Sequence, residues 1–156
     1  MKFGHLFRFK SWINNYEYIK QEDKELLLID LCGRLPYGVK GMLCEDCICT
    51  LDKIWTKKGY ELVVFAGDYY DVDCFKPYLF PLSSMTEEQR NELKSLLRPS
   101  VLKSLDEDNE DMGFPTLISA NPSVIEIDYY NKNHIDYRGL IEKSLALDAT
   151  NLGIYE

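Results

Sequence analysis

The feature that most constrains the fold is a change in hydrophobic spacing at Pro36. Across residues 22–35 the leucines and isoleucine recur at the three- and four-residue spacings of a helix with a broad buried face, and Pro36 ends this pattern. The following runs, residues 38–44, 47–56 and 60–66, are short and rich in β-branched and aromatic residues. Such runs are typical of an antiparallel meander, with Lys58-Gly59 as a hairpin turn.

Capping signals predict a second helix after residue 83. Thr86 with Gln89, and Ser84 with Glu87, both have the spacing of a capping box, so the helix begins at Ser84 or Thr86. Pro99 should end it. Before this helix, residues 76–82 contain two prolines, which favours an extended connection or an edge strand over a central strand.

A third helix should open at Asn121-Pro122, where a capping residue precedes a proline at the first helical position. It should end near Asn133, and residues 140–149 can form a last short helix with their leucines facing inward. We therefore predict an α+β fold, in which a small antiparallel sheet of three to four strands carries about three helices.

Length sets the domain organisation. The 156 residues suffice for one sizeable core and are too few for two ordinary domains. We expect a single α+β domain over residues 21–156, preceded by an N-terminal extension over residues 1–20 that can add an edge strand.

Charge and cysteine usage limit partners and location. A formal net charge of −8 disfavours nucleic acid as a partner. The sequence has no secretory signal and no apolar run near the roughly 18 residues needed to cross a bilayer, so no membrane partner is expected. Five cysteines, an odd number, suit a reducing compartment and predict a cytoplasmic location, in a bacterial cell or an infected host.

The cysteines at 44, 47 and 49 form the sharpest chemical pattern. Cys44 and Cys47 have the spacing of half a zinc site, with Cys49 beside them, but a structural site needs four ligands and the sequence has no second such pair. The favoured interpretation is structural: if Glu45-Asp46 is a hairpin turn, Cys44 and Cys47 face each other across two strands. These cysteines remain weak metal candidates, and we expect no cofactor.

The segment from His134 to Arg138 gathers acid–base side chains at a helix end. His134, Asp136 and Arg138 could serve a general acid–base reaction, but no activated nucleophile accompanies them. The favoured interpretation is a structural turn, in which His134 caps helix carbonyls while Asp136 and Arg138 fix the turn by hydrogen bonds. Without a complete catalytic set, no residue is assigned as catalytic.

Aromatic residues are more numerous than a core of this size requires. The chain has eleven tyrosines, and Tyr69-Tyr70 and Tyr129-Tyr130 form adjacent pairs of which at least one member should face outward. Exposed aromatics often anchor protein interfaces, so these four tyrosines are candidate interaction residues. The alternative is that they line the edge of the core with their hydroxyls in water.

Three motifs carry a resemblance to known proteins: residues 34–40 (RLPYGVK), 76–88 (KPYLFPLSSMTEE) and 136–143 (DYRGLIEK). In this order they resemble a group of small proteins, uncharacterised in function, of gut Bacteroidales bacteria and their phages and prophages. The chain departs from the group at Gly33, Phe80 and Ser144, where alanine, a basic residue and glycine are usual. Ser144 argues against a tight positive-φ turn at that point.

The resemblance implies a phage or mobile-element setting and no known activity. We therefore expect a non-enzymatic protein-binding or accessory module, with an unknown protein or a second copy of the chain as its partner. The alternative is a small metal-dependent protein or enzyme that uses the Cys44, Cys47 and Cys49 cluster or the turn from His134 to Arg138.

Overall fold

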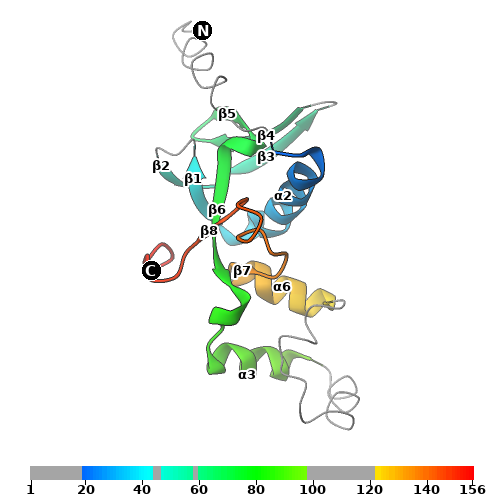
Figure 1. Cartoon of the computed structure of the whole chain (residues 1–156), viewed down its shortest axis with the longest axis vertical. Helices are drawn as coiled ribbons and strands as arrows, with labels where there is room; N and C mark the ends of the chain where they lie inside the picture. The colour runs from blue at the N-terminus through cyan, green and yellow to red at the C-terminus, as the bar shows by residue number, and fades with distance from the viewer. Residues whose placement is uncertain (1–18, 44–46, 58–59, 98–121) are drawn as a thin grey trace, which may run out of the picture.

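The computed structural model describes residues 19–43, 47–57, 60–97 and 122–156. Within these ranges the chain forms three α-helices and two sheets, so the predicted α+β class is confirmed (Figure 1). One sheet has the strand order β2-β1-β6-β7, with β8 also paired to β6, and the other has the order β3-β4-β5. Residues 1–18 of the N-terminal extension, Cys44, Pro99 and the turns at Glu45-Asp46 and Lys58-Gly59 lie outside the described residues.

Helix α2 (Gln21–Arg34) forms where leucine spacing predicts it. Its buried face carries Leu27 and Leu31, and the chain continues into a 3₁₀ turn (Leu35–Tyr37) that ends at Gly38 with φ 64°. Glycine suits this left-handed position because it has no Cβ. The leucines of α2 belong to the main hydrophobic cluster, which also contains Val63 and Phe75.

Strand β6 (Phe75–Pro81) lies centrally in the first sheet, and the predicted edge position of this segment is wrong. Strand β1 (Lys40–Leu43) pairs antiparallel with Phe75–Pro77, and the two-residue strands β8 (Leu147–Asp148) and β7 (Ile135–Asp136) pair in parallel with the rest of β6. Because each neighbour pairs with only part of β6, its two prolines interrupt no continuous ladder.

A single meander was predicted for residues 38–66, whereas these residues divide between the two sheets. Strand β2 (Cys47–Thr50) forms a hairpin with β1, while β3 (Lys53–Lys57) pairs with β4 (Tyr60–Phe65), and β4 also pairs with β5 (Asp68–Asp71). The division falls at Leu51, which is 3% exposed and joins the main core. Burial of this linker residue turns the chain from one sheet into the next.

Helix α3 (Glu87–Leu96) begins at the Thr86 capping box, one of the two predicted starts. The Gln89 N–H donates to the Thr86 Oγ1 at 3.2 Å, and the Thr86 N–H donates to the Gln89 side chain at 2.9 Å. Helix α3 packs against α6 around a second hydrophobic cluster that includes Leu93 and Tyr130. Both helices lie at the far end of β6 from the three-stranded sheet (Figure 1).

Helix α6 (Val124–Lys132) begins at Ser123, so the predicted cap at Asn121-Pro122 is wrong. The Glu126 N–H donates to the Ser123 Oγ at 3.3 Å, and the Ser123 N–H donates to the Glu126 carboxylate at 2.6 Å. This reciprocal pair satisfies two backbone donors at once, which a cap at Asn121 would leave unpaired. The Ser-x-x-Glu spacing was the available signal.

We expect Ser123→Ala to reduce the free energy of unfolding by about 1 kcal/mol, because the Glu126 N–H loses its acceptor. Urea unfolding monitored by circular dichroism measures the loss. Ser83→Ala, at an exposed serine in the short 3₁₀ helix Leu82–Ser84, is the matched control and should stay within about 0.5 kcal/mol of the parent chain. Equal effects of the two substitutions would contradict this role of the cap.

The predicted helix over residues 140–149 is absent, and the segment forms turns followed by β8. Gly139 and Ser144 have φ values of 71° and 60°, which a helix cannot contain. The Ser144 N–H donates to the Ile141 carbonyl at 3.0 Å, and the Leu145 N–H donates to the Leu140 carbonyl at 2.9 Å. The tight positive-φ turn therefore forms with serine, contrary to the expectation from the sequence.

Gly33 has a packing role in α2. A Cβ on Gly33 would lie 2.8 Å from the Nδ2 of Asn131 on α6. The missing side chain lets the two helices approach at this point.

Among the described residues, no helix combines the length and apolar character that a membrane crossing requires.

Candidate functional site

The outer face of the three-stranded sheet carries an exposed aromatic pair. Val63 of β4 belongs to the main core, so strand alternation places Val64 on the opposite, outer face. On that face Trp55 of β3 lies opposite Leu62, and Tyr69 of β5 lies opposite Val64. The Trp55 and Tyr69 rings meet edge to face with centroids 6.2 Å apart. Since β4 separates their strands, this contact spans β4.

The pair combines burial beneath it with exposure of its own rings. Val64 is 1% exposed, whereas Trp55 is 40% and Tyr69 51% exposed. Two neighbouring, partly exposed aromatic rings supply the rigid and partly apolar surface that often anchors protein interfaces. We call Trp55, Leu62, Val64 and Tyr69 the aromatic face.

Charge differs between the two strands that border the aromatic face. Strand β3 has the sequence KIWTK, with a lysine at each end, and β5 has the sequence DYYD, with an aspartate at each end. Both lysines share the face of Trp55, whereas Asp71 is the one β5 aspartate on that face, because Asp68 lies opposite the core residue Phe65. Trp55 was not among the predicted interaction residues, although its alternation with Ile54 was a usable signal.

The four candidate interaction tyrosines have different environments. Tyr69 is exposed, while Tyr70 turns to the inner face and contacts the Phe65 ring at 6.3 Å. Tyr129 and Tyr130 are 4% and 0% exposed, so the expectation of one outward member is wrong for that pair. The physical reason is that α6 has neighbours on two sides. The Tyr129 hydroxyl donates to the Gln89 carbonyl of α3 at 3.0 Å, and the Tyr130 ring stacks on Tyr137.

A buried ion pair connects α2 to the segment after α6. Asp30 and Arg34 are 1% and 0% exposed, with Arg34 Nε 2.6 Å from Asp30 Oδ2 and Nη2 3.0 Å from Oδ1. The guanidinium also donates to the carbonyls of Tyr130 at 3.3 Å and Ile135 at 2.8 Å. Arg138 Nε lies 3.5 Å from the same aspartate. Every contact of this group is internal, which indicates a structural role.

The turn from His134 to Arg138 is built by Asp136. Its carboxylate accepts from the N–H groups of Leu140 at 2.9 Å and Ile141 at 2.8 Å, which holds the turn together. The Arg138 guanidinium lies over the Tyr137 ring, 4.8 Å from its centroid. These contacts support the structural interpretation of Asp136 and Arg138.

His134 does not cap the carbonyls of α6 as expected. Asn133 does so, because its Nδ2 donates to the Tyr129 carbonyl at 2.9 Å. The His134 ring instead stacks on Tyr155, with centroids 3.9 Å apart, and its Nδ1 has no hydrogen-bond partner among the described residues. Burial, followed by the charges of Arg34 and Lys40, lowers the pKa of His134 to about 4. The imidazole is therefore neutral at neutral pH.

A second cluster of ionisable side chains, Lys24, Asp71 and Asp73, lies where α2 meets β5. Lys24 Nζ is 2.8 Å from Asp71 Oδ1 and 3.1 Å from Asp73 Oδ1. Burial and the neighbouring Asp71 raise the pKa of Asp73 to about 6. Burial opposes the charge on Asp71, but its hydrogen bonds with Asp73 and Lys24 outweigh that effect and lower its pKa. The group fixes α2 to the end of the sheet and encloses no ligand space.

The cysteine cluster does not have the predicted arrangement. Leu43, not Cys44, lies opposite Cys47, because the connection between β1 and β2 is one residue longer than a two-residue turn. Cys49 lies opposite Gly41 and its Sγ is 3.9 Å from that carbonyl. Across the described ranges, no three side chains of His, Cys, Asp or Glu gather in a way that could hold a metal ion.

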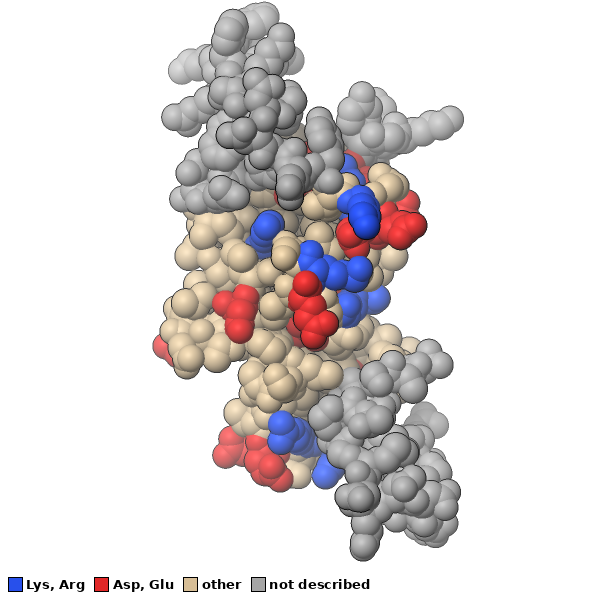
Figure 2. All heavy atoms as spheres, in the orientation of Figure 1, with Lys and Arg blue, Asp and Glu red and all other residues tan. Residues whose placement is uncertain are grey.

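The charged surface is mixed. On the face seen in Figure 2, lysines and arginines are interspersed with acidic residues and form no single basic area. This distribution adds nothing in favour of a nucleic-acid partner.

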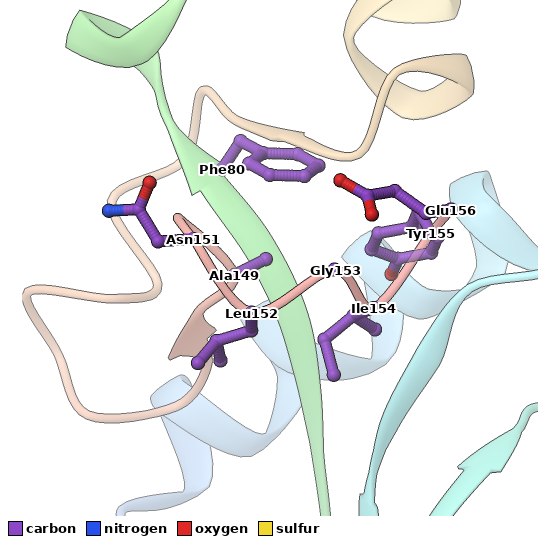
Figure 3. Close-up of a pocket in the computed structure, with 8 residues that line it drawn as sticks. All are labelled: Phe80, Ala149, Asn151, Leu152, Gly153, Ile154, Tyr155 and Glu156. Atoms are coloured by element: carbon purple, nitrogen blue, oxygen red, sulfur yellow. The ribbon is translucent and has the colours of Figure 1, made fainter.

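A shallow hollow of about 630 Å³ lies beside the C-terminal residues. Its lining comes from Phe80 of β6, Ala149 and residues 151–156 (Figure 3).

No protein-family model, curated protein or solved structure matches the chain.

Proposed function

We propose that this chain is a non-enzymatic protein-binding module that associates with a second copy of itself through the aromatic face. The observation that carries the proposal is the exposed Trp55–Tyr69 pair on a sheet whose other face already covers the core. A phage or mobile-element origin, which the three sequence motifs imply, is part of the same proposal.

Charge favours a second copy as the partner. A two-fold axis parallel to β4 lays β3 of each copy over β5 of the other. That arrangement brings the two lysines of β3 toward Asp71, the β5 aspartate on the outer face, twice in each dimer. The same axis brings the four rings of two aromatic faces together. Pairing of like edges, β3 on β3 or β5 on β5, would instead oppose like charges.

Sedimentation velocity over a range of concentrations tests this function. We expect a reversible dimer for the parent chain, and association that is weaker by about thirtyfold or more for Trp55→Ala and for Tyr69→Ala, as is typical of interface anchors (about 2 kcal/mol or more). Val124→Ala, at the 82% exposed start of α6, is the matched control and should leave dimerisation unchanged. A parent chain that stays monomeric at the highest concentration would contradict the proposal.

A charge reversal tests the orientation. Lys53→Glu should weaken the dimer, because it replaces the cation that faces Asp71 of the second copy with an anion. Lys132→Glu, at the exposed end of α6, is the matched control and should leave the dimer unchanged. Equal effects of the two substitutions would exclude this arrangement of β3 and β5.

A further inference from the structure

Tyr155 is held by three separate parts of the chain: β1, β6 and the turn at His134. Its ring stacks on His134 at 3.9 Å with an interplanar angle of 12°, and lies 5.9 Å from the Phe80 ring. Its hydroxyl donates to the Tyr78 carbonyl at 2.8 Å and accepts from the Lys40 N–H at 3.1 Å. Both parts of the phenol therefore have contacts of their own: the ring packs on other rings, and the hydroxyl forms hydrogen bonds.

The groups around Tyr155 are fixed by contacts that do not involve it. His134 has φ 54°, its N–H donates to the Asn131 carbonyl at 3.3 Å, and its carbonyl accepts from the Phe80 N–H at 2.8 Å. The hydroxyl partners lie on strands β1 and β6, which pair directly with each other. The groups that contact Tyr155 therefore lie on paired strands and on a constrained turn that have their own backbone hydrogen bonds.

The segment that carries Tyr155 has few other attachments. The Ala149 N–H donates to the Leu79 carbonyl at 2.8 Å, and Lys40 Nζ donates to the Ile154 carbonyl at 2.6 Å. Between these points the chain passes beside the hollow, and Leu152 is 53% exposed (Figure 3). Tyr155 is thus the main side-chain anchor of this segment.

We propose that His134, Phe80, the Tyr78 carbonyl and the Lys40 N–H form a phenol-binding site, which Tyr155 occupies in this conformation and which takes another para-substituted phenol when Tyr155 leaves. The ring stack alone would accept any flat apolar ring. The hydroxyl contacts make the site selective, because a ring without a hydroxyl leaves a part-buried donor and a part-buried acceptor unpaired. A tyrosine side chain of another polypeptide has the required chemistry.

Chemical rescue tests the site. Tyr155→Gly in the full chain vacates it, and p-cresol, the side chain of tyrosine as a free molecule, is the probe. We expect p-cresol to raise the melting temperature of this variant in a saturable manner, since a ligand that binds only the folded state stabilises it. Toluene, which lacks the hydroxyl, should raise it much less, and the parent chain, with the site filled, should show no saturable shift. Equal shifts with p-cresol and toluene, or no shift with either, would overturn the proposal.

A second variant serves if Tyr155→Gly does not fold. Tyr155→Phe keeps the ring and removes only the hydroxyl, so the Lys40 N–H loses its acceptor. We expect at least tenfold faster hydrogen exchange at the Lys40 amide, and a return toward the parent rate when p-cresol displaces the phenylalanine ring. An unchanged exchange rate in Tyr155→Phe would show that the hydroxyl is not recognised.

Discussion

Arg34→Met should reduce the free energy of unfolding by about 3–5 kcal/mol, which is enough to leave a substantial unfolded fraction of a marginally stable domain at 37 °C. The substitution removes the main partner of a carboxylate that is 1% exposed, Asp30, and leaves it charged inside the protein. It also removes the donor from the buried carbonyls of Tyr130 and Ile135. Urea denaturation with two independent probes measures the loss.

Two further variants separate charge from shape. Asp30→Leu combined with Arg34→Met removes both charges, so it should be less destabilising than Arg34→Met alone, although two carbonyls remain without their donor. Arg90→Met on α3 is the matched surface control, because its ion pair with Glu87 is long, 3.9 Å, and exposed. That control should cost less than about 1 kcal/mol. An Arg34→Met chain as stable as the control would contradict the assigned role.

Arg138 limits the expected loss. Its Nε is already 3.5 Å from Asp30, and its side chain is 28% exposed, so it can move toward the orphaned carboxylate. The combination of Arg34→Met with Arg138→Met should therefore cost more than the two single losses added together. This coupling would show that the two arginines share one carboxylate.

Local signals predicted helices α2 and α3 well. The leucine spacing of α2 and the capping box at Thr86 depend on residues within one turn of each other, and both predictions are confirmed. The start of α6 was wrong because the Asn-Pro signal was preferred to the Ser123–Glu126 pair two residues later. Both signals are local, and the one that satisfies more backbone donors prevails.

Long-range pairing was the harder part. Two prolines in β6 locally indicate an edge, but β1, β7 and β8 each pair with a different part of that strand. No local sequence pattern indicates which distant segments of the chain will pair with a strand. The same limit explains why the division of the strands into two sheets was not foreseen.

The candidate sites also differ in whether a local sequence signal could reveal them. Tyr69 could be singled out because its neighbour Tyr70 alternates with it in a strand. The Asp30–Arg34 pair left a local trace, two opposite charges four residues apart on the apolar side of a leucine-rich helix. The stack of His134 on Tyr155 left none, since only the folded chain brings together residues 21 positions apart.

Acid should loosen the Tyr155 segment through His134. The pKa of His134 is lowered from its ordinary 6.5 to about 4, chiefly by burial, so the unfolded chain binds this proton more readily than the folded chain. The stability that the neutral imidazole contributes is therefore complete above pH 6.5 and declines as the pH falls toward 4. Three charges lie around the ring or behind it, namely Arg34 with its partner Asp30 on α2 and Lys40 on β1.

Asp73 acts in the opposite direction over nearly the same range. Its pKa is raised to about 6, so its contribution is complete at low pH and is lost as the pH rises through 6. The stability of the parent chain between pH 4 and 6.5 is therefore a difference between two effects of opposite sign. A flat profile would not by itself argue against either group, and variants must separate them.

His134→Asn isolates the histidine, because asparagine does not titrate and tolerates the left-handed φ of 54°. From pH 7 to pH 4.5 the parent chain should lose about 2 kcal/mol relative to His134→Asn, which is less than the full shift implies because pH 4.5 is still above the lowered pKa of about 4. Hydrogen exchange should quicken over residues 150–156 first, since Tyr155 leaves a charged imidazole before the sheets unfold. Parallel pH profiles for the two chains would show that His134 does not ionise in this range, and that the Tyr155 segment responds to another group.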